Sequence, residues 1–227
     1  MKKVLLILGV ACCSSLAAWA ANVNEELQTS ADVFHEIMAT PDKGIPQDLM
    51  DKAYCVVIVP GLKKAAFVVG GQYGRGVVTC RRGPGRGFGA PAAVRVEGGS
   101  FGFQIGGSST DVVMLIMNED GMKKLDRDKF TVGADASVAA GPVGRSGTAD
   151  TDAILHAEIL SWSRSRGLFA GVALDGATLR QDKDDNKVLY GEPLDNKAIL
   201  MTDRKVPPAA HPLIAELDRF VASQRGK

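Results

Sequence analysis

The spacing of apolar residues predicts helices at both ends of the chain. From Asn22 to Thr40 they recur three or four positions apart, which is typical of a helix with one buried face: Leu27, Ala31, Phe34 and Met38. Pro41 and Gly44 end this helix, and a short helical turn is expected at Gln47–Lys52. The last helix begins at Pro212, which suits the first helical position, and its apolar face carries Leu213, Leu217, Phe220 and Val221.

The middle of the chain changes to β-branched runs separated by glycine. Cys55–Val59 and Asp111–Met117 are almost wholly apolar, as expected of strands buried on both faces. Two turn signals predict hairpins. Tyr73-Gly74-Arg75 would join Ala65–Gln72 to Gly76–Arg81, and Gly98-Gly99 would join Ala92–Glu97 to Ser100–Ile105. Further strands are expected at Ile154–Ser163 and Gly167–Leu174, and Asn118 is expected to cap a short helix.

These patterns predict the fold class. We expect a single α+β domain with a central, mainly antiparallel, glycine-rich β-sheet, sandwich- or barrel-like, flanked by N- and C-terminal helices. The 26 glycines are spread through the strand region, which indicates tight turns and close backbone packing.

The first 20 residues have the pattern of a cleavable secretory signal. Lys2 and Lys3 precede the apolar run Val4–Ala11, which is too short to span a bilayer, and Ala18-Trp19-Ala20 is a small-x-small cleavage pattern. We therefore expect residues 21–227 to form the mature domain, exported to the periplasm or cell envelope. A lipoprotein attached through Cys12 is the minor alternative, because Gly9 stands where a branched apolar residue is expected.

The charge distribution argues against nucleic-acid binding and marks one segment of the chain that has no acidic residue. Without Lys2 and Lys3, the 27 basic residues become 25 against 26 acidic ones, a balance that argues against nonspecific nucleic-acid binding. No Asp or Glu occurs from Ala53 to Val96, which we call the basic window. The cations of such a window either lie together on one basic face or lie separately at ordinary solvated hairpin tips. Its cations are Lys63, Lys64, Arg75, Arg81, Arg82, Arg86 and Arg95.

Motifs for catalysis are incomplete. The glycine clusters are followed by strand or lie in a loop with prolines, so no helix N-terminus is available for a phosphate. His156 lies two residues before Glu158 in a strand-like segment, and we interpret it as a core-edge histidine. We therefore expect a non-enzymatic protein that needs no cofactor.

One run of acids resembles the start of a calcium loop: Asp182, Asp184 and Asn186. Lys187 stands where the loop requires glycine, and Pro193 stands where it requires a bidentate Glu. An EF-hand is excluded, and a weak surface cation site is the most that this run could form.

Two of the four cysteines remain after the signal, Cys55 and Cys80. In an oxidising compartment we expect them to form a disulfide. In a simple meander of the predicted strands they would lie at opposite ends, too far apart to bridge. The bond therefore requires a different strand order, or a bend that brings the later strand's end back towards Cys55.

Longer segments carry a family resemblance that covers about residues 55–191. The blocks Cys55–Lys64, Phe67–Gly76, Ser100–Gly107, Thr110–Asn118, Gly133–Gly144 and Ser161–Asp175 occur in the order seen in the SYLF domain family, and the chain is identified as a member on these blocks. Phe88 is a departure, because the family usually has tryptophan near this position, before the equivalent of Pro91.

The resemblance implies a membrane-lipid-binding domain. Its eukaryotic members bind phosphoinositides and some act on actin filaments. An exported chain would not meet actin, so anionic phospholipid headgroups are the expected ligand class. The candidate lipid-binding residues are Lys63, Lys64, Arg75, Arg81, Arg82 and Arg86, with Arg164 and Arg166 as possible additions. Two alternatives stay open: a carrier that holds a lipid tail in an apolar cavity, and an envelope module with a protein partner.

Overall fold

A computed structural model describes residues 22–40, 44–83, 86–125, 127–143, 156–165, 168–171, 174 and 176–222. The expected signal segment, Cys12 and Arg166 lie outside these residues. After an N-terminal helix at residues 22–39, the elements are α2 (Gln47–Lys52), β1 (Cys55–Cys80), β2 (Ala92–Ile116), α3 (Glu119–Lys124), β3 (Lys129–Thr131), β4 (Val138–Ala140), β5 (Ile159–Ser165), β6 (Leu168–Gly171), β7 (Thr178–Gln181), α5 (Lys183–Tyr190), α6 (Asn196–Leu200), a 3₁₀ turn (Pro208–Ala210) and α7 (His211–Ala222).

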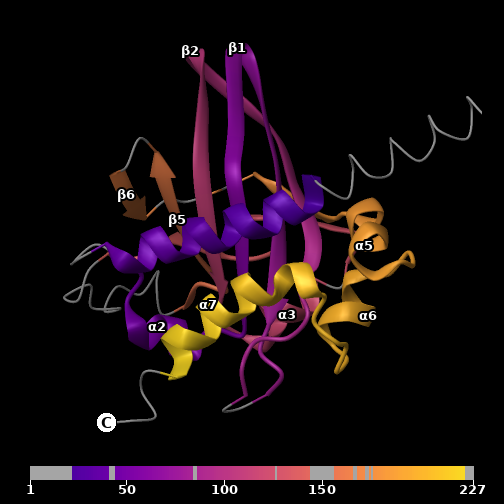
Figure 1. Cartoon of the computed structure of the whole chain (residues 1–227). Coiled ribbons are helices and arrows are strands. Elements are labelled where there is room, and N and C mark those ends of the chain that lie inside the picture. Colours follow the sequence, from indigo (N-terminus) through magenta and orange to yellow (C-terminus); the bar gives the residue numbers. More distant parts are fainter. Residues whose placement is uncertain are drawn as a thin grey trace, which may run out of the picture.

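Two unusually long strands, β1 and β2, dominate the fold. They pair antiparallel from Cys55 opposite Ile116 to Val78 opposite Ala92, with register shifts near Leu62 and Val68. In Figure 1 the two strands rise together from the body and return to it, so the ribbon folds back on itself. The two ends of β1 therefore meet, and the Arg81 N–H donates to the Tyr54 carbonyl at 2.9 Å.

Both predicted hairpins are wrong, because each supposed turn lies inside the ribbon. Tyr73–Arg75 pairs with Glu97–Arg95, and Gly98–Gly99 pairs with Gln72–Gly71. Gly74 and Gly76 of β1 serve close packing instead of turns. A Cβ on Gly76 would overlap the Ile58 carbonyl and lie 2.8 Å from the Val59 Cα. Glycine there lets one half of β1 lie directly against the other.

The remaining strands attach to the two ends of β2. β7 pairs with Val94–Glu97 and carries β3 on its other edge, while β5 pairs with Asp111–Ile116 and carries β4 and β6. Only the β4–β5 pair is parallel among the described strands. The predicted α+β domain with a mainly antiparallel sheet and terminal helices is thus confirmed.

The alternating side chains of the sheet build two cores. Val56, Ile58, Val113 and Leu115 face a layer formed by the N-terminal helix, α2 and α7. Cys55, Val57, Val112 and Met114 point into the curl of the sheet, where apolar residues of α6, β3 and β7 join them. Burial on both faces explains why these segments are continuous apolar runs rather than alternating ones. The N-terminal helix and α7 lie side by side in Figure 1.

The helix signals of the sequence are largely confirmed. Asn118 caps α3, because its Oδ1 accepts the Gly121 N–H at 2.8 Å. The acidic run considered as a weak cation site forms a helix instead: Asp182 caps α5 by accepting the Asp185 N–H at 3.2 Å. Within the described part of the chain, no helix is long and apolar enough to cross a bilayer.

Cys55 and Cys80 are joined by a disulfide in the structure, with Cα atoms 4.0 Å apart. Twenty-six residues of extended strand would span about 85 Å. The bend that the sequence required is the fold-back of the ribbon, and it brings the two ends of one strand together. Both cysteines are buried inside the curl.

We expect a protein of residues 21–227, denatured without reductant, to show no free thiol. Replacing both cysteines by alanine should lower the free energy of unfolding by about 3 kcal/mol, because the bond closes a loop of 25 residues in the unfolded chain. Thiol titration and urea unfolding measure these two results. Two free thiols per chain would show that Cys55 and Cys80 do not form the bond in the purified protein.

Gly76→Ala should destabilise the protein by about 2 kcal/mol or more, because the added Cβ meets backbone atoms that cannot rotate away. Gly71→Ala is the matched control, since its Cβ would meet only the Gly98 carbonyl at 3.9 Å. Both changes replace glycine by alanine in β1, so the difference in strand propensity between these residue types affects both variants equally. Equal urea midpoints for the two variants would contradict the close crossing.

Candidate functional site

The structure divides the candidate lipid-binding residues by how their charges are used. Arg75, Arg81 and Arg164 are bound to partners from other elements. Lys63 and Arg82 are exposed, and Lys64 is partly exposed. Arg86 is 63% exposed and lies 3.9 Å from Asp203.

Arg75 ties three elements together. Its guanidinium donates to the carboxylate of Asp185, a side chain only 2% exposed at the start of α5. It also donates to Asn22 Oδ1 at 3.2 Å and lies 3.8 Å from Glu26, both on the N-terminal helix. Burial raises the pKa of Glu26 to about 7, although Arg75 opposes that shift. Arg75 is therefore a structural anchor between β1, α5 and the N-terminal helix.

Arg164 anchors the other end of the same helix. Its Nε and Nη2 donate to Asp111 Oδ2 at 3.0 and 2.7 Å, and its Nη1 pairs with Glu36. The Asp111 side chain also accepts the Gly61 N–H at 2.9 Å. Sequence reasoning could not assign this role, because Arg164 lies 53 positions from Asp111 and far from Glu36 along the chain.

Arg81 holds the loop that joins β1 to β2. It donates to the carbonyls of Ala53 and Met50 at 2.8 and 2.7 Å, and its guanidinium lies 4.8 Å from the centre of the buried Phe88 ring. Burial lowers the pKa of Arg81. The aromatic position that departs from the family pattern thus packs against a cation of the basic window.

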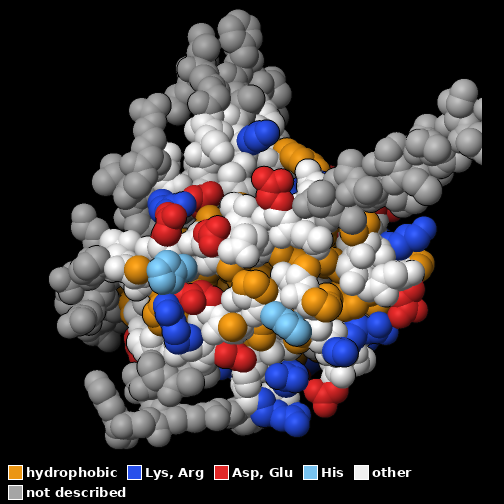
Figure 2. All heavy atoms as spheres, viewed as in Figure 1, with side chains coloured by type: hydrophobic (Ala, Val, Ile, Leu, Met, Phe, Trp, Pro, Cys, Tyr) orange, Lys and Arg blue, Asp and Glu red, His pale blue; other side chains and the backbone are white. Residues whose placement is uncertain are grey.

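The exposed cations do not form one patch. Lys63 is eight positions from Cys55 along β1, about 25 Å of extended strand. Arg82 follows Cys80, which is bonded to Cys55 at the base of the ribbon. On the face formed by the N-terminal helix and α7, cations and acids are interspersed (Figure 2). The basic window is therefore split between the ribbon and the loop below it.

The cations on the ribbon pair with uncharged residues of β2. Lys63 pairs with Ser109 and Lys64 with Ser108 on β2. From Gly98 to Thr110, β2 contains no charged residue. Tyr73, which the sequence suggested as part of a turn, lies on the returning half of β1 and is 49% exposed. Lys63, Lys64 and Tyr73 together form what we call the ribbon collar.

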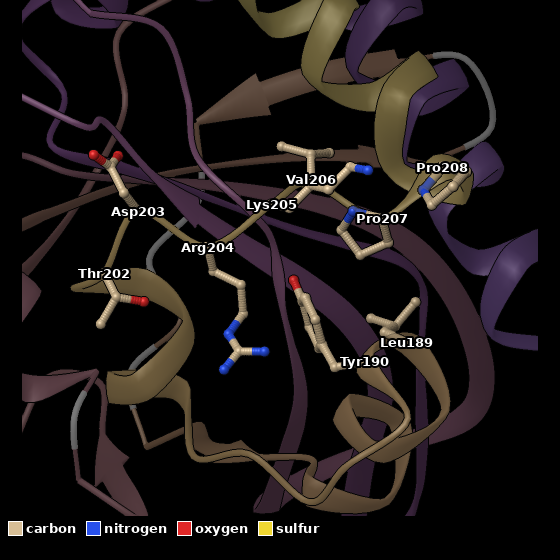
Figure 3. A pocket seen from close by; sticks show the side chains of 9 residues that line it. All are labelled: Leu189, Tyr190, Thr202, Asp203, Arg204, Lys205, Val206, Pro207 and Pro208. Atoms are coloured by element: carbon tan, nitrogen blue, oxygen red, sulfur yellow. The ribbon is translucent and has the colours of Figure 1, made fainter.

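A separate groove of about 570 Å³ lies between α5 and the segment that leads to α7 (Figure 3). The Arg204 guanidinium lies 5.7 Å from the centre of the Tyr190 ring and pairs with Glu192 at 3.0 Å. The Tyr190 hydroxyl donates to the Pro91 carbonyl at 2.5 Å, and burial raises the pKa of Tyr190. Both polar side chains are thus engaged in holding the groove's shape.

The carboxylate that the sequence places near His156 is engaged in the fold. Glu158 is bound by Lys124 at 2.6 and 2.7 Å and accepts the Ser137 N–H at 3.0 Å. Among these residues, no group of three His, Cys, Asp or Glu side chains could hold a metal ion.

Residues 97–220 match the family Ysc84, described as "Las17-binding protein actin regulator". The chain is 34% identical to Protein YSC84 of Saccharomyces cerevisiae over 180 residues, which is 78% of this chain and 38% of that protein. The chain belongs to the SYLF, or Ysc84, family. Human SH3 domain-containing YSC84-like protein 1 is 31% identical over 206 residues, 88% of this SYLF chain and 60% of the relative.

The family resemblance drawn from the glycine-rich blocks is thus confirmed. This SYLF chain spans about two fifths to three fifths of the length of these relatives. The segment matched to the family contains most of β2, from Glu97 to Ile116, and all the residues that line the groove beside α5.

Glu26 should make the protein less stable as pH rises. Its folded-state pKa is about 7, above the ordinary 4.5, so its contribution is fully present below the ordinary value and is lost as pH rises through 7. Glu26→Gln should therefore gain about 1 to 3 kcal/mol relative to the parent between pH 5 and pH 8. Urea unfolding at both pH values measures this.

Glu25→Gln on the exposed face of the same helix is the control and should show no such gain. If the free energy of unfolding depends on pH in both variants as it does in the parent, the pKa of Glu26 is not raised in the folded protein.

Proposed function

We propose that this chain binds anionic membrane lipids reversibly at the cell envelope, after export and removal of residues 1–20. The observation that carries the proposal is the ribbon collar. Lys63 and Lys64 stand on β1 within the basic window, in which 44 residues contain no acid, and β2 opposite them is uncharged from Gly98 to Thr110. Their charge is available to a ligand, in contrast to that of Arg75 and Arg164.

The charge chemistry favours a lipid surface over a single tight site. Each basic group near an anionic bilayer contributes about 1 kcal/mol, and salt screens that attraction within about 10 Å. Two lysines would hold the protein weakly and reversibly. Anionic phospholipid headgroups are the proposed ligand class, and phosphoinositides share the same chemistry.

The carrier alternative finds less support. In the described part of the chain, the inside of the curl is occupied by buried side chains, including Val57, Met114, Phe130 and Leu179. A lipid tail would have to displace this core.

A protein partner is the second candidate. The matched family is described as Las17-binding, and the groove lined by Tyr190 and Arg204 lies within the matched segment. Export would separate this chain from cytosolic actin, so the partner would be an envelope protein. Arg204→Glu should leave vesicle binding unchanged if the groove serves a protein and the ribbon serves the membrane.

The proposal predicts salt-sensitive sedimentation of residues 21–227 with phosphatidylglycerol vesicles and little with phosphatidylcholine vesicles. Lys63→Glu/Lys64→Glu should weaken the affinity at least tenfold, since reversing each charge replaces attraction by repulsion. The control is Lys187→Glu/Lys205→Glu, which changes the net charge equally at exposed positions away from the ribbon.

Absence of parent binding to phosphatidylglycerol vesicles would reject lipid binding. Equal losses in the two double variants would show that binding follows net charge and not the ribbon collar.

A further inference from the structure

A second cleft lies at the base of the ribbon, where the two ends of β1 meet. It has a volume of about 330 Å³ and is lined by Asp51–Tyr54, by Arg81 and Gly83, and by Met122 of α3. We call it the base cleft. Figure 1 shows α2 and α3 at the end of the molecule opposite the fold-back, so the base cleft and the ribbon collar are separate sites.

Arg81 places a positive charge in the wall of the base cleft. Its Nε and Nη2 donate to the carbonyls of Ala53 and Met50 at 2.8 and 2.7 Å. No carboxylate among the described residues forms an ion pair with it. Burial lowers the pKa of Arg81, and the more distant carboxylates of Asp51 and Asp218 offset that shift only in part. An anion in the base cleft would therefore stabilise this partly buried cation.

The charges around Arg81 also favour an anionic ligand. Lys52 ends α2 and is exposed, and Arg82 beside the base cleft is exposed as well. Neither of these two forms an ion pair with another described residue. Asp51 is the single acid among the described lining residues, and its Oδ1 accepts a hydrogen bond from Gln47 Nε2 at 3.0 Å. Cations thus outnumber acids in this wall.

The rest of the lining is mainly apolar. Tyr54 is 43% exposed, although its backbone is fixed by hydrogen bonds with Arg81 and Ile116 at 2.9 and 2.8 Å. Ala53 and Met122 complete this apolar wall. An exposed aromatic ring and a thioether beside a guanidinium suit a ligand that carries both a hydrocarbon part and an acid group.

We propose that the base cleft binds a single-chain anionic amphiphile, with its acid group at Arg81 and Lys52 and its hydrocarbon chain along the apolar wall. The volume of the base cleft is near the lower end of the roughly 300 to 1,000 Å³ of small-molecule sites, which favours one chain over a two-chain phospholipid. The inference goes beyond the proposed membrane binding, because its ligand is a dissolved molecule and the ribbon collar takes no part.

The test titrates a protein of residues 21–227 with octanoate, acetate and octanol, and isothermal titration calorimetry measures the affinities. Octanoate should bind saturably, one molecule per chain, and at least tenfold more tightly than the other two. Acetate lacks the apolar chain, and octanol lacks the charge. Octanoate binding no tighter than acetate would indicate a plain anion site, and binding no tighter than octanol a plain apolar one. Either result would overturn the amphiphile site.

A tryptophan in the base cleft locates the ligand. The emission of Tyr54→Trp should shift to the blue as octanoate binds, because the chain replaces water at the ring. Tyr73→Trp on the ribbon is the matched control, since Tyr73 is similarly exposed at 49%, and it should not respond. Trp162 is buried and bonded to the Pro142 carbonyl, so the parent supplies a constant background. A shift in both variants, or in neither, would overturn the assignment to the base cleft.

Reversal of one charge tests the cations of the base cleft. Lys52→Glu should weaken octanoate binding at least tenfold, because it repels the carboxylate of the ligand. Lys187→Glu, at an exposed position of α5, changes the net charge equally and should bind octanoate like the parent. Lys52 is changed rather than Arg81 because Arg81 also holds backbone carbonyls. Equal affinities of the parent and Lys52→Glu for octanoate would overturn the proposed site.

Discussion

The fold-back of one continuous two-stranded ribbon is the constraint on which the rest of the structure depends. Because β1 and β2 stay paired through the bend, four stretches of strand are placed by a single set of backbone hydrogen bonds. The bend brings Cys55 to Cys80 and requires glycine where one half of β1 crosses the other. β5 and β7 then pair with the two ends of β2, and the other described strands pair with β5 or β7.

The arginines of this SYLF chain divide between structure and surface according to what the ribbon brings near them. Arg75 and Arg164 sit where the two ends of the N-terminal helix cross the sheet, and each meets a carboxylate of that helix. Removing such charges from water is favourable only with close partners, so they are committed to the fold. Among the described residues, the lysines of the ribbon collar form no ion pair with these acids, and both side chains are at least partly exposed.

This division changes how the basic window is interpreted. A stretch without acids looks like one binding face in the sequence, yet its cations are divided between the ribbon and the loop at its base. The same ribbon separates the ribbon collar from the groove at Tyr190 and Arg204, so a membrane and a protein partner could be bound by different parts of the chain. Membership in the Ysc84 family is consistent with either ligand.

The elements whose signals are local could be predicted from the amino-acid sequence alone. The helix periods at residues 22–39 and after Pro212, the Asn118 cap and the doubly buried runs at Cys55–Val59 and Asp111–Met117 all depend on neighbours within a turn or a strand. Only the tertiary structure decided whether Gly74 and Gly98 make turns or close contacts, since a glycine favours both. It also decided which cations stay free, because the carboxylates that bind Arg75 and Arg164 lie tens of residues away in the chain. Such pairs follow from the path of the ribbon, and no local pattern encodes that path.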